Sequence, residues 1–156
     1  MKDRSGGGAV NFCVKMAATF FGVGFLPFMP GTWGSVVAVI LAWFLYQGLP
    51  YWIIGFSVVG LWACRPATVI FHSKDPKQFV MDEVCGMMFS VLWLPKSMLL
   101  FCLAFVLFRA LDVWKPWPIS KIQDSSHPSS IMWDDIAAGL FANLILRVAM
   151  GTVLKI

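Results

Sequence analysis

Residues 33–64 read WGSVVAVILAWFLYQGLPYWIIGFSVVGLWAC and contain no charged side chain. The turn-forming Gly48-Leu49-Pro50 divides this stretch into two apolar runs, 33–49 and 51–64. The short break between them predicts an antiparallel helical hairpin. Each run is shorter than the roughly 20 residues of a comfortable bilayer crossing, so we expect local thinning of the bilayer or extension at the helix ends.

The composition of the whole chain agrees with this pattern. Its 156 residues are 59% hydrophobic and 13% charged, and the mean hydropathy is +0.77. Soluble domains carry about 25% charged residues, so a soluble fold of this size would lack the polar surface to cover itself. The chain is therefore predicted to be a small all-α, multi-spanning integral membrane protein with short helices.

Four further apolar stretches predict the remaining helices. They lie at 10–29, 84–94, 97–108 and 136–150. Lys15 and Pro27 interrupt the first, which predicts a short helix followed by irregular chain. The next two predict a second hairpin with short arms, and the last predicts a single helix.

Polar stretches at 65–83 and 109–135 separate these runs, and the polar start predicts a disordered tail over residues 1–8. Residues 9–156 then form a single membrane domain. If both hairpins span, nine basic residues fall on one side and two on the other. The nine are Lys2, Arg4, Lys15, Arg65, Lys74, Lys77, Arg109, Lys115 and Lys121. The positive-inside rule places both polar stretches in the cytoplasm.

The net charge of +4 does not point to nucleic acid. The basic residues sit between apolar runs and form no patch with spaced aromatic side chains on a polar face. The membrane is the expected partner, and no obligate protein partner is evident.

Five of the eight acidic residues lie at the ends of apolar runs on the predicted cytoplasmic side. They are Asp82, Glu83, Asp112, Asp134 and Asp135. Such carboxylates are costly unless they are paired or bind a metal, so we expect the helix ends to gather them into one site. Oxygen ligands with few histidines favour a hard cation, Mg²⁺ or Mn²⁺, over zinc. Solvated loop ends are the alternative.

Arg109, Asp112 and Lys115 are spaced three residues apart, so they share a helix face. Pro116 should stop this helix near Lys115. The spacing predicts Asp112 on a metal and Arg109 or Lys115 on phosphoryl oxygens. A salt-bridged helix terminus is the alternative.

The segment 30–35, PGTWGS, opens an apolar helix. Thr32 is expected as its N-cap, with Ser35 completing the first turn. The exposed N–H groups and the positive end of the helix dipole would favour an anion, which makes both residues candidate substrate contacts. Ordinary capping is the alternative.

Four segments together resemble the phosphatidylglycerophosphatase A family, in the family's own order. They are 22–35 (GVGFLPFMPGTWGS), 81–86 (MDEVCG), 108–119 (FRALDVWKPWPI) and 134–139 (DDIAAG). The Arg-x-x-Asp-x-x-Lys-Pro-Trp-Pro piece is the most specific. Met81 stands where the family usually has an aromatic residue, and His127-Pro-Ser-Ser130 where it usually has a glycine-rich stretch.

The resemblance implies Mg²⁺-dependent hydrolysis of the terminal phosphate of phosphatidylglycerophosphate, which gives phosphatidylglycerol and phosphate. The reaction would take place at the cytoplasmic face of the bacterial inner membrane. The five carboxylates are the expected metal ligands. They are also expected to be catalytic, as is Lys115, while Arg109, Lys115, Thr32 and Ser35 are expected to bind substrate.

Several alternatives stay open at this point. One or two ions could bind, and the reaction could use water or a covalent aspartyl intermediate. The substrate could be another lipid phosphate. A non-enzymatic cation carrier is a further alternative, but it would need acidic groups deep in the spans, and these lie at span ends.

Overall fold

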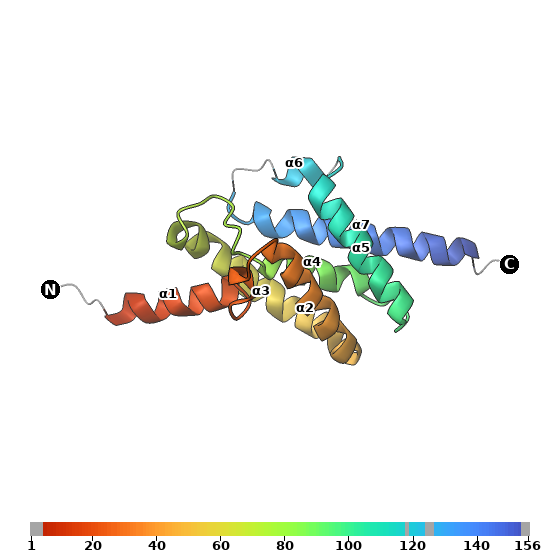
Figure 1. The fold of residues 1–156 in the computed structure, drawn as a ribbon, viewed down its shortest axis with the longest axis horizontal. Coiled ribbons are helices and arrows are strands. Elements are labelled where there is room, and N and C mark those ends of the chain that lie inside the picture. The colour runs from red at the N-terminus through yellow and green to blue at the C-terminus, as the bar shows by residue number, and fades with distance from the viewer. Residues whose placement is uncertain (1–4, 118, 124–126, 154–156) are drawn as a thin grey trace.

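The computed structural model of this chain describes residues 5–117, 119–123 and 127–153, and these residues form helices and no strand. Figure 1 shows the helices in chain order. They are α1 (Ser5–Ala18), η1 (Val23–Phe25), α2 (Pro30–Phe44), η2 (Tyr46–Gly48), α3 (Leu49–Ile70), α4 (Met81–Val91), α5 (Met98–Trp114), α6 (Ile119–Gln123) and α7 (Ser130–Val153). The predicted all-α class is confirmed.

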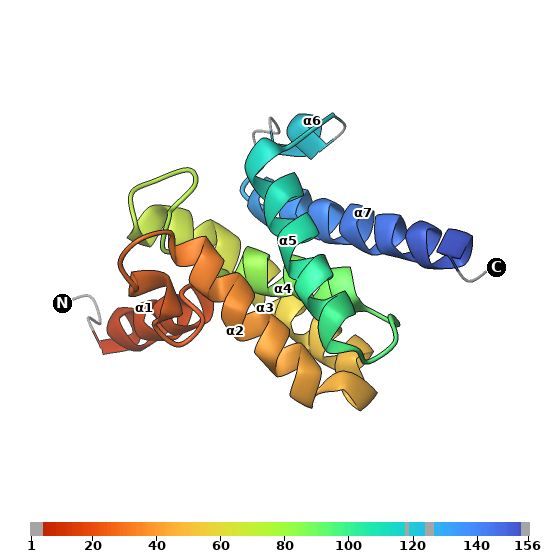
Figure 2. The ribbon, with the colours of Figure 1, turned by 45° about the vertical axis from the view of Figure 1, so that its right-hand side comes forward.

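Helix α4 is the centre of the fold. Nine of its eleven residues are buried, and it packs against α7, α2, α3 and α5, most extensively against α7. Figure 2 shows it enclosed among these helices. A helix that is apolar on nearly all sides must be covered on all sides. The one buried hydroxyl of α4, Ser90, is satisfied within the helix by donating to the Met87 carbonyl oxygen at 2.7 Å.

Two glycines allow α4 and α7 to meet backbone to backbone. A Cβ atom on Gly86 would lie 2.5 Å from the Asp135 carbonyl oxygen and 2.6 Å from the Phe108 ring. A Cβ atom on Gly139 would overlap the Gly86 carbonyl oxygen. Small residues at a helix crossing permit this close approach in membrane proteins as well as in soluble ones.

The other end of α4 is held by polar contacts from α7. The Asn143 side-chain amide donates to the carbonyl oxygens of Ser90 and Leu92, at 3.0 and 2.9 Å. Arg147 donates to the Asn143 side-chain oxygen at 2.7 Å and to the Leu92 carbonyl oxygen at 2.9 Å. These bonds satisfy carbonyl groups that a helix end leaves unpaired, and they fix α4 along α7.

The surface of the fold is apolar. Among the described residues one helical segment, Tyr46–Ile70, is long and apolar enough to cross a bilayer. Helix α4 has 11 residues, so it is about 16 Å long against a hydrocarbon core of about 30 Å. Phe28 and Phe44 are 90% and 77% exposed. Aromatic side chains in such positions are compatible with a membrane protein, in which lipid covers them.

The first prediction that needs correcting is the N-terminal tail. Helix α1 begins at Ser5, so the second half of the expected tail over 1–8 is helical, and residues 1–4 lie outside the described ones. Helix α1 packs against α3, and its side chains Val14 and Ala18 are fully buried. Tertiary packing of this kind outweighs the poor helix propensity of the glycines at 6–8.

The second correction concerns α3 and the hairpins. Helix α3 continues through Arg65 and Pro66 to Ile70, inside the expected polar stretch 65–83, because buried residues such as Ala63 and Ala67 anchor it on its neighbours. Helices α2 and α3 are joined as expected, but each packs mainly on other helices, and both contact α4. The core therefore forms around α4 and does not form between the two arms of a hairpin.

The glycine crossing leads to a stability prediction. Gly86→Ala should lower the free energy of unfolding by about 1–3 kcal/mol, because the added methyl group meets backbone that cannot yield. Gly55→Ala is the matched control, since α3 has open space at Gly55 and alanine should stabilise a helix there by up to about 1 kcal/mol. Thermal unfolding of the purified variants in detergent measures both changes. A Gly86→Ala variant as stable as Gly55→Ala would contradict the close contact.

Candidate active site

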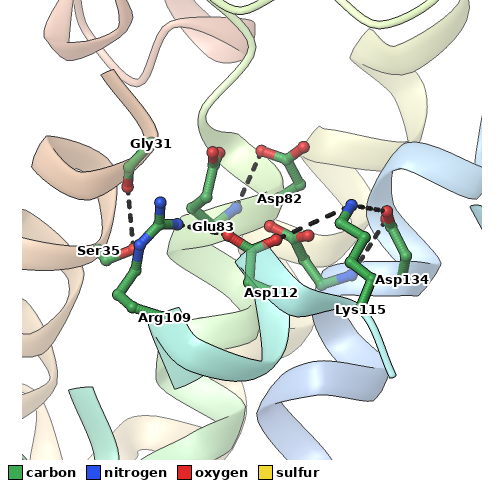
Figure 3. Close-up of polar contacts among 9 residues, drawn as sticks. Gly31, Ser35, Asp82, Glu83, Arg109, Asp112, Lys115 and Asp134 are labelled. Carbon is green, nitrogen blue, oxygen red and sulfur yellow. Dashed lines mark hydrogen bonds and ion pairs between the residues drawn. The ribbon is translucent and has the colours of Figure 1, made fainter. Parts of the chain in front are cut away.

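The ends of four helices enclose a polar pocket. The N-terminal parts of α4 and α7, the C-terminal part of α5 and the start of α2 surround a cavity of about 350 Å³, which we call the acidic pocket. Its lining includes seven charged side chains that the sequence had singled out (Figure 3). They are Asp82, Glu83, Arg109, Asp112, Lys115, Asp134 and Asp135. The structure thus brings together all five predicted carboxylates and both predicted cations.

Asp82 and Glu83 lie in the first turn of α4, where negative charge is favoured by the helix dipole, whereas Asp134 and Asp135 follow the first turn of α7. The Glu83 backbone N–H donates to Asp82 Oδ1 at 2.9 Å, and the Asp135 backbone N–H donates to Asp134 Oδ1 at 3.1 Å. In both pairs the first carboxylate therefore accepts a bond from the backbone of the second, and this fixes its orientation.

The two cations hold the carboxylates that lie between α5 and α7. Arg109 Nη1 lies 2.5 Å from Asp112 Oδ2. Lys115 Nζ lies 2.5 Å from Asp134 Oδ2 and 3.9 Å from Asp112 Oδ1. Burial opposes the charge of Lys115, but the bond with Asp134 and the negative charges of the nearby carboxylates together outweigh burial and raise the pKa of the ammonium. Lys115 therefore joins the end of α5 to the start of α7.

Helix α5 ends where the sequence predicts. Its last residue is Trp114, and Lys115 is the C-cap in a left-handed conformation with φ of 41°. Pro116 follows and cannot continue a helix. A left-handed backbone is uncommon for a residue with a side chain. The chain adopts it at Lys115, the residue whose ammonium reaches into the pocket.

Asp82, Glu83 and Asp135 form the candidate metal centre. Each offers an oxygen atom, and these oxygen atoms all lie within 4.8 Å of one another. Glu83 Oε2 is buried and has no hydrogen-bond partner among the described residues. Burial, reinforced by neighbouring carboxylates, raises the pKa of Asp82 and of Asp135, which lie outside the Tyr46–Ile70 segment. An all-oxygen set of buried carboxylates fits a hard divalent cation.

The PGTWGS segment plays a different part from the one expected. The N-cap of α2 is Met29, and Pro30 occupies the first turn, where its fixed φ suits helix initiation. Thr32 is therefore inside the helix, and its Oγ1 is buried without a partner among the described residues. The Ser35 hydroxyl donates to the Gly31 carbonyl oxygen at 2.9 Å. Neither is among the described side chains that line the acidic pocket.

Gly31 is the residue of this segment that meets the pocket. A Cβ atom at this position would overlap Glu83 Oε1, so the glycine lets α2 approach the acidic turn of α4. The loop between α3 and α4 adds two charged residues that the sequence reasoning missed, Asp75 and Lys77, which also line the pocket. Their position in the sequence could have indicated this. They lie a few residues before Asp82, in the loop that leads into the acidic first turn of α4.

The fold and the pocket define an all-helical protein with an apolar surface and a buried site that has groups for a metal and for an anion. The phosphatidylglycerophosphatase A family profile matches residues 16–150. The chain belongs to this family, which confirms the resemblance seen in the sequence. It is therefore a phosphatase, that is, a phosphoric monoester hydrolase.

Curated relatives extend over nearly the whole chain. Escherichia coli K12 phosphatidylglycerophosphatase A is 36% identical over 138 residues, which cover 84% of this chain and 80% of the relative. The Haemophilus influenzae protein of the same name is 29% identical over 140 residues, 85% and 86% of the two chains. A Bacteroides thetaiotaomicron protein with the provisional name phosphatidylinositol-3-phosphatase is 31% identical over 155 residues, 92% and 97% of the two chains. No solved structure matches the chain.

Divalent-cation binding should release protons and should tighten as the pH rises. The pKa values of Asp82 and Asp135 are raised in the metal-free protein, so these groups hold protons to higher pH than ordinary aspartates, and a cation competes with those protons. Calorimetric titration with MgCl₂ at about pH 6 and about pH 8, in two buffers of different ionisation enthalpy, measures both effects. Asp135→Asn should release fewer protons. An affinity that is independent of pH would contradict this assignment.

Proposed function

We propose that this protein hydrolyses the terminal phosphate of phosphatidylglycerophosphate in a Mg²⁺-dependent reaction and releases phosphatidylglycerol and phosphate. The observation that supports this most is the convergence of five carboxylates, Arg109 and Lys115 in one pocket of a chain from this family. The names of the Escherichia coli and Haemophilus influenzae relatives supply the substrate. The Bacteroides thetaiotaomicron relative makes a phosphoinositide the second candidate.

A cation is needed because the pocket is too negative for the substrate. Its carboxylates outnumber Arg109 and Lys115, and a phosphate monoester adds further negative charge. Asp82, Glu83 and Asp135 would hold Mg²⁺, and their oxygen atoms are the ligands this ion prefers. When bound, the ion would neutralise phosphoryl oxygens and lower the pKa of a coordinated water molecule.

Arg109 and Lys115 are proposed to bind the phosphoryl oxygens. A guanidinium has five N–H donors and an ammonium has three, so each keeps donors beyond those in its ion pairs. Their side chains are only 16% and 22% exposed, so solvent screens them weakly. Asp112 and Asp134 hold the two cations in place. A carboxylate of the pocket would accept the proton that water loses during attack.

We further propose that the chain lies in the bacterial inner membrane with the acidic pocket facing the cytoplasm. The excess of basic residues on that side supports this orientation. Trp114 and Trp117, beside the pocket, are 81% and 74% exposed, as interfacial anchors would be. The carboxylates lie near helix ends, which suits a phosphate at headgroup depth better than ion transport through the middle of a span.

The proposed activity predicts phosphate release by the purified protein from phosphatidylglycerophosphate, loss of that release in EDTA, and recovery with Mg²⁺. A panel that includes phosphatidylinositol 3-phosphate and phosphatidic acid defines the preferred headgroup. In the same assay Lys115→Arg, Lys115→Met and Arg109→Lys should each lower kcat/KM by about tenfold or more. An exchanged cation would misplace its N–H donors on the phosphate, and methionine offers none.

Lys74→Met is the control for lost positive charge, since Lys74 is exposed and is not among the residues that line the pocket. Measurements of thermal stability distinguish a role of Lys115 and Arg109 in substrate binding from a purely structural role in ion pairs. If activity fell only in parallel with the fraction of folded protein, both residues would be ion-pair partners of structural importance and would not bind substrate. Full activity without a divalent cation would contradict the metal centre.

The proposed orientation predicts how single cysteines react from each side of the membrane. In a cysteine-free background, Ser73→Cys in the α3–α4 loop should resist a membrane-impermeant thiol reagent in intact spheroplasts and react after lysis. Lys96→Cys, in the α4–α5 turn at the other end of the fold, should react without lysis. The reverse pattern would place the acidic pocket outside the cytoplasm.

A further inference from the structure

A second hollow lies between α2 and α5, and it differs from the acidic pocket in being apolar. Its volume is about 610 Å³, and no charged side chain lines it. We call it the α2–α5 groove. Its lining includes Val36, Ile40 and Trp43 of α2 and Phe101, Cys102 and Phe105 of α5. Figures 1 and 2 both show the two helices running in roughly opposite directions.

The groove leads away from the acidic pocket. The start of α2 lines the pocket with Gly31, and the C-terminal part of α5 lines it with Arg109 and Asp112. On these helices Val36 and Val106 are the groove residues nearest the pocket, five residues from Gly31 and three from Arg109. At 1.5 Å per residue these are separations of about 8 Å along α2 and about 4–5 Å along α5. The two hollows therefore follow one another along the same pair of helices.

The length of the groove fits one lipid leaflet. It extends along α2 from Val36 to Phe44 and along α5 from Met98 to Val106, which is about 12 Å on each helix. Half of a hydrocarbon core of about 30 Å is about 15 Å. An acyl chain whose headgroup phosphate lies at the acidic pocket would therefore extend over the length of the groove.

The far end of the groove is braced by aromatic and polar contacts. Trp43 and Phe101 pack edge to face with ring centroids 5.3 Å apart, and Phe101 is buried. Lys96 Nζ lies 4.9 Å from the centroid of the Trp43 ring. The Tyr46 hydroxyl donates to the Leu94 carbonyl oxygen at 2.6 Å, which ties η2, directly after α2, to the α4–α5 turn. The groove is therefore preformed.

We infer that the α2–α5 groove binds one acyl chain of the lipid substrate while the phosphate of that lipid occupies the acidic pocket. The inference rests on the proposed function, since it assigns the apolar part of the same substrate. Bilayer lipid is as apolar as the groove, so transfer of the chain alone contributes little. The groove acts by orienting the lipid, which holds the phosphorus next to Arg109 and the carboxylates.

Filling the groove tests this assignment. Ile40→Trp and Cys102→Trp place bulk in it at positions that are exposed on the protein surface. The assay compares kcat/KM for dioleoyl-phosphatidylglycerophosphate with that for its dihexanoyl analogue in the same mixed micelles. Each variant should lower the long-chain to short-chain ratio by about tenfold, the scale on which small changes in an apolar pocket alter specificity.

Leu103→Trp is the matched control. Leu103 neighbours Cys102 on α5 and is also exposed, but it does not line the groove. It should leave the ratio unchanged. An unchanged ratio in Ile40→Trp and Cys102→Trp, or an equal loss in Leu103→Trp, would overturn the assignment. Failure of the proposed function looks different, since the unmodified protein would then release phosphate from neither chain length.

Photolabelling tests the groove independently of turnover. A lipid phosphate with a diazirine in one acyl chain should label residues within 36–44 or 98–106 of the unmodified protein. Excess unlabelled dioleoyl-phosphatidylglycerophosphate should compete, and dioleoyl-phosphatidylglycerol should compete far less because it lacks the terminal phosphate. Equal competition by both lipids would show a bulk membrane lipid in the groove and would refute the inference.

Discussion

The crossing of α4 and α7 at Gly86 and Gly139 determines where the charged groups of this protein can lie. Each glycine follows an acidic residue by four positions, Asp82 on α4 and Asp135 on α7. Four residues are about one helical turn, so both carboxylates lie one turn from the same backbone contact. The close approach of the helices thus brings together two acidic turns that would otherwise repel each other.

The fold tolerates this repulsion because it divides the carboxylates into two groups. Asp112 and Asp134 are paired with Arg109 and Lys115. The other three lie close together and form no ion pair with a described residue, and burial raises the pKa of Asp82 and of Asp135. Buried like charges cost stability, and sites of this kind persist where chemistry requires them. The packing around α4 and the polar contacts at its far end offset that cost.

The sequence predicted features that depend on local chemistry. Pro116 indicated the end of α5, and the position of acidic residues at the ends of apolar runs indicated the pocket. Prediction from the sequence failed where contacts between residues far apart in the chain determine the role of a residue. A glycine in an apolar run does not show whether it crosses another helix, so the roles of Gly31 and Gly86 were not visible. Thr32 was expected as an N-cap because its side chain suits one, but Pro30 starts the helix earlier.

The conformation of Lys115 has a consequence for substitutions at this position. Its left-handed backbone is a conformation that glycine adopts at no steric cost and that costs other residues of order 1 kcal/mol or more. Glycine at this position would relax the chain, but it would also remove the ammonium that joins α5 to α7. The relaxed backbone and the lost Lys115–Asp134 ion pair would change stability in opposite directions, so glycine would replace one source of instability with another, a buried Asp134 carboxylate without its cation.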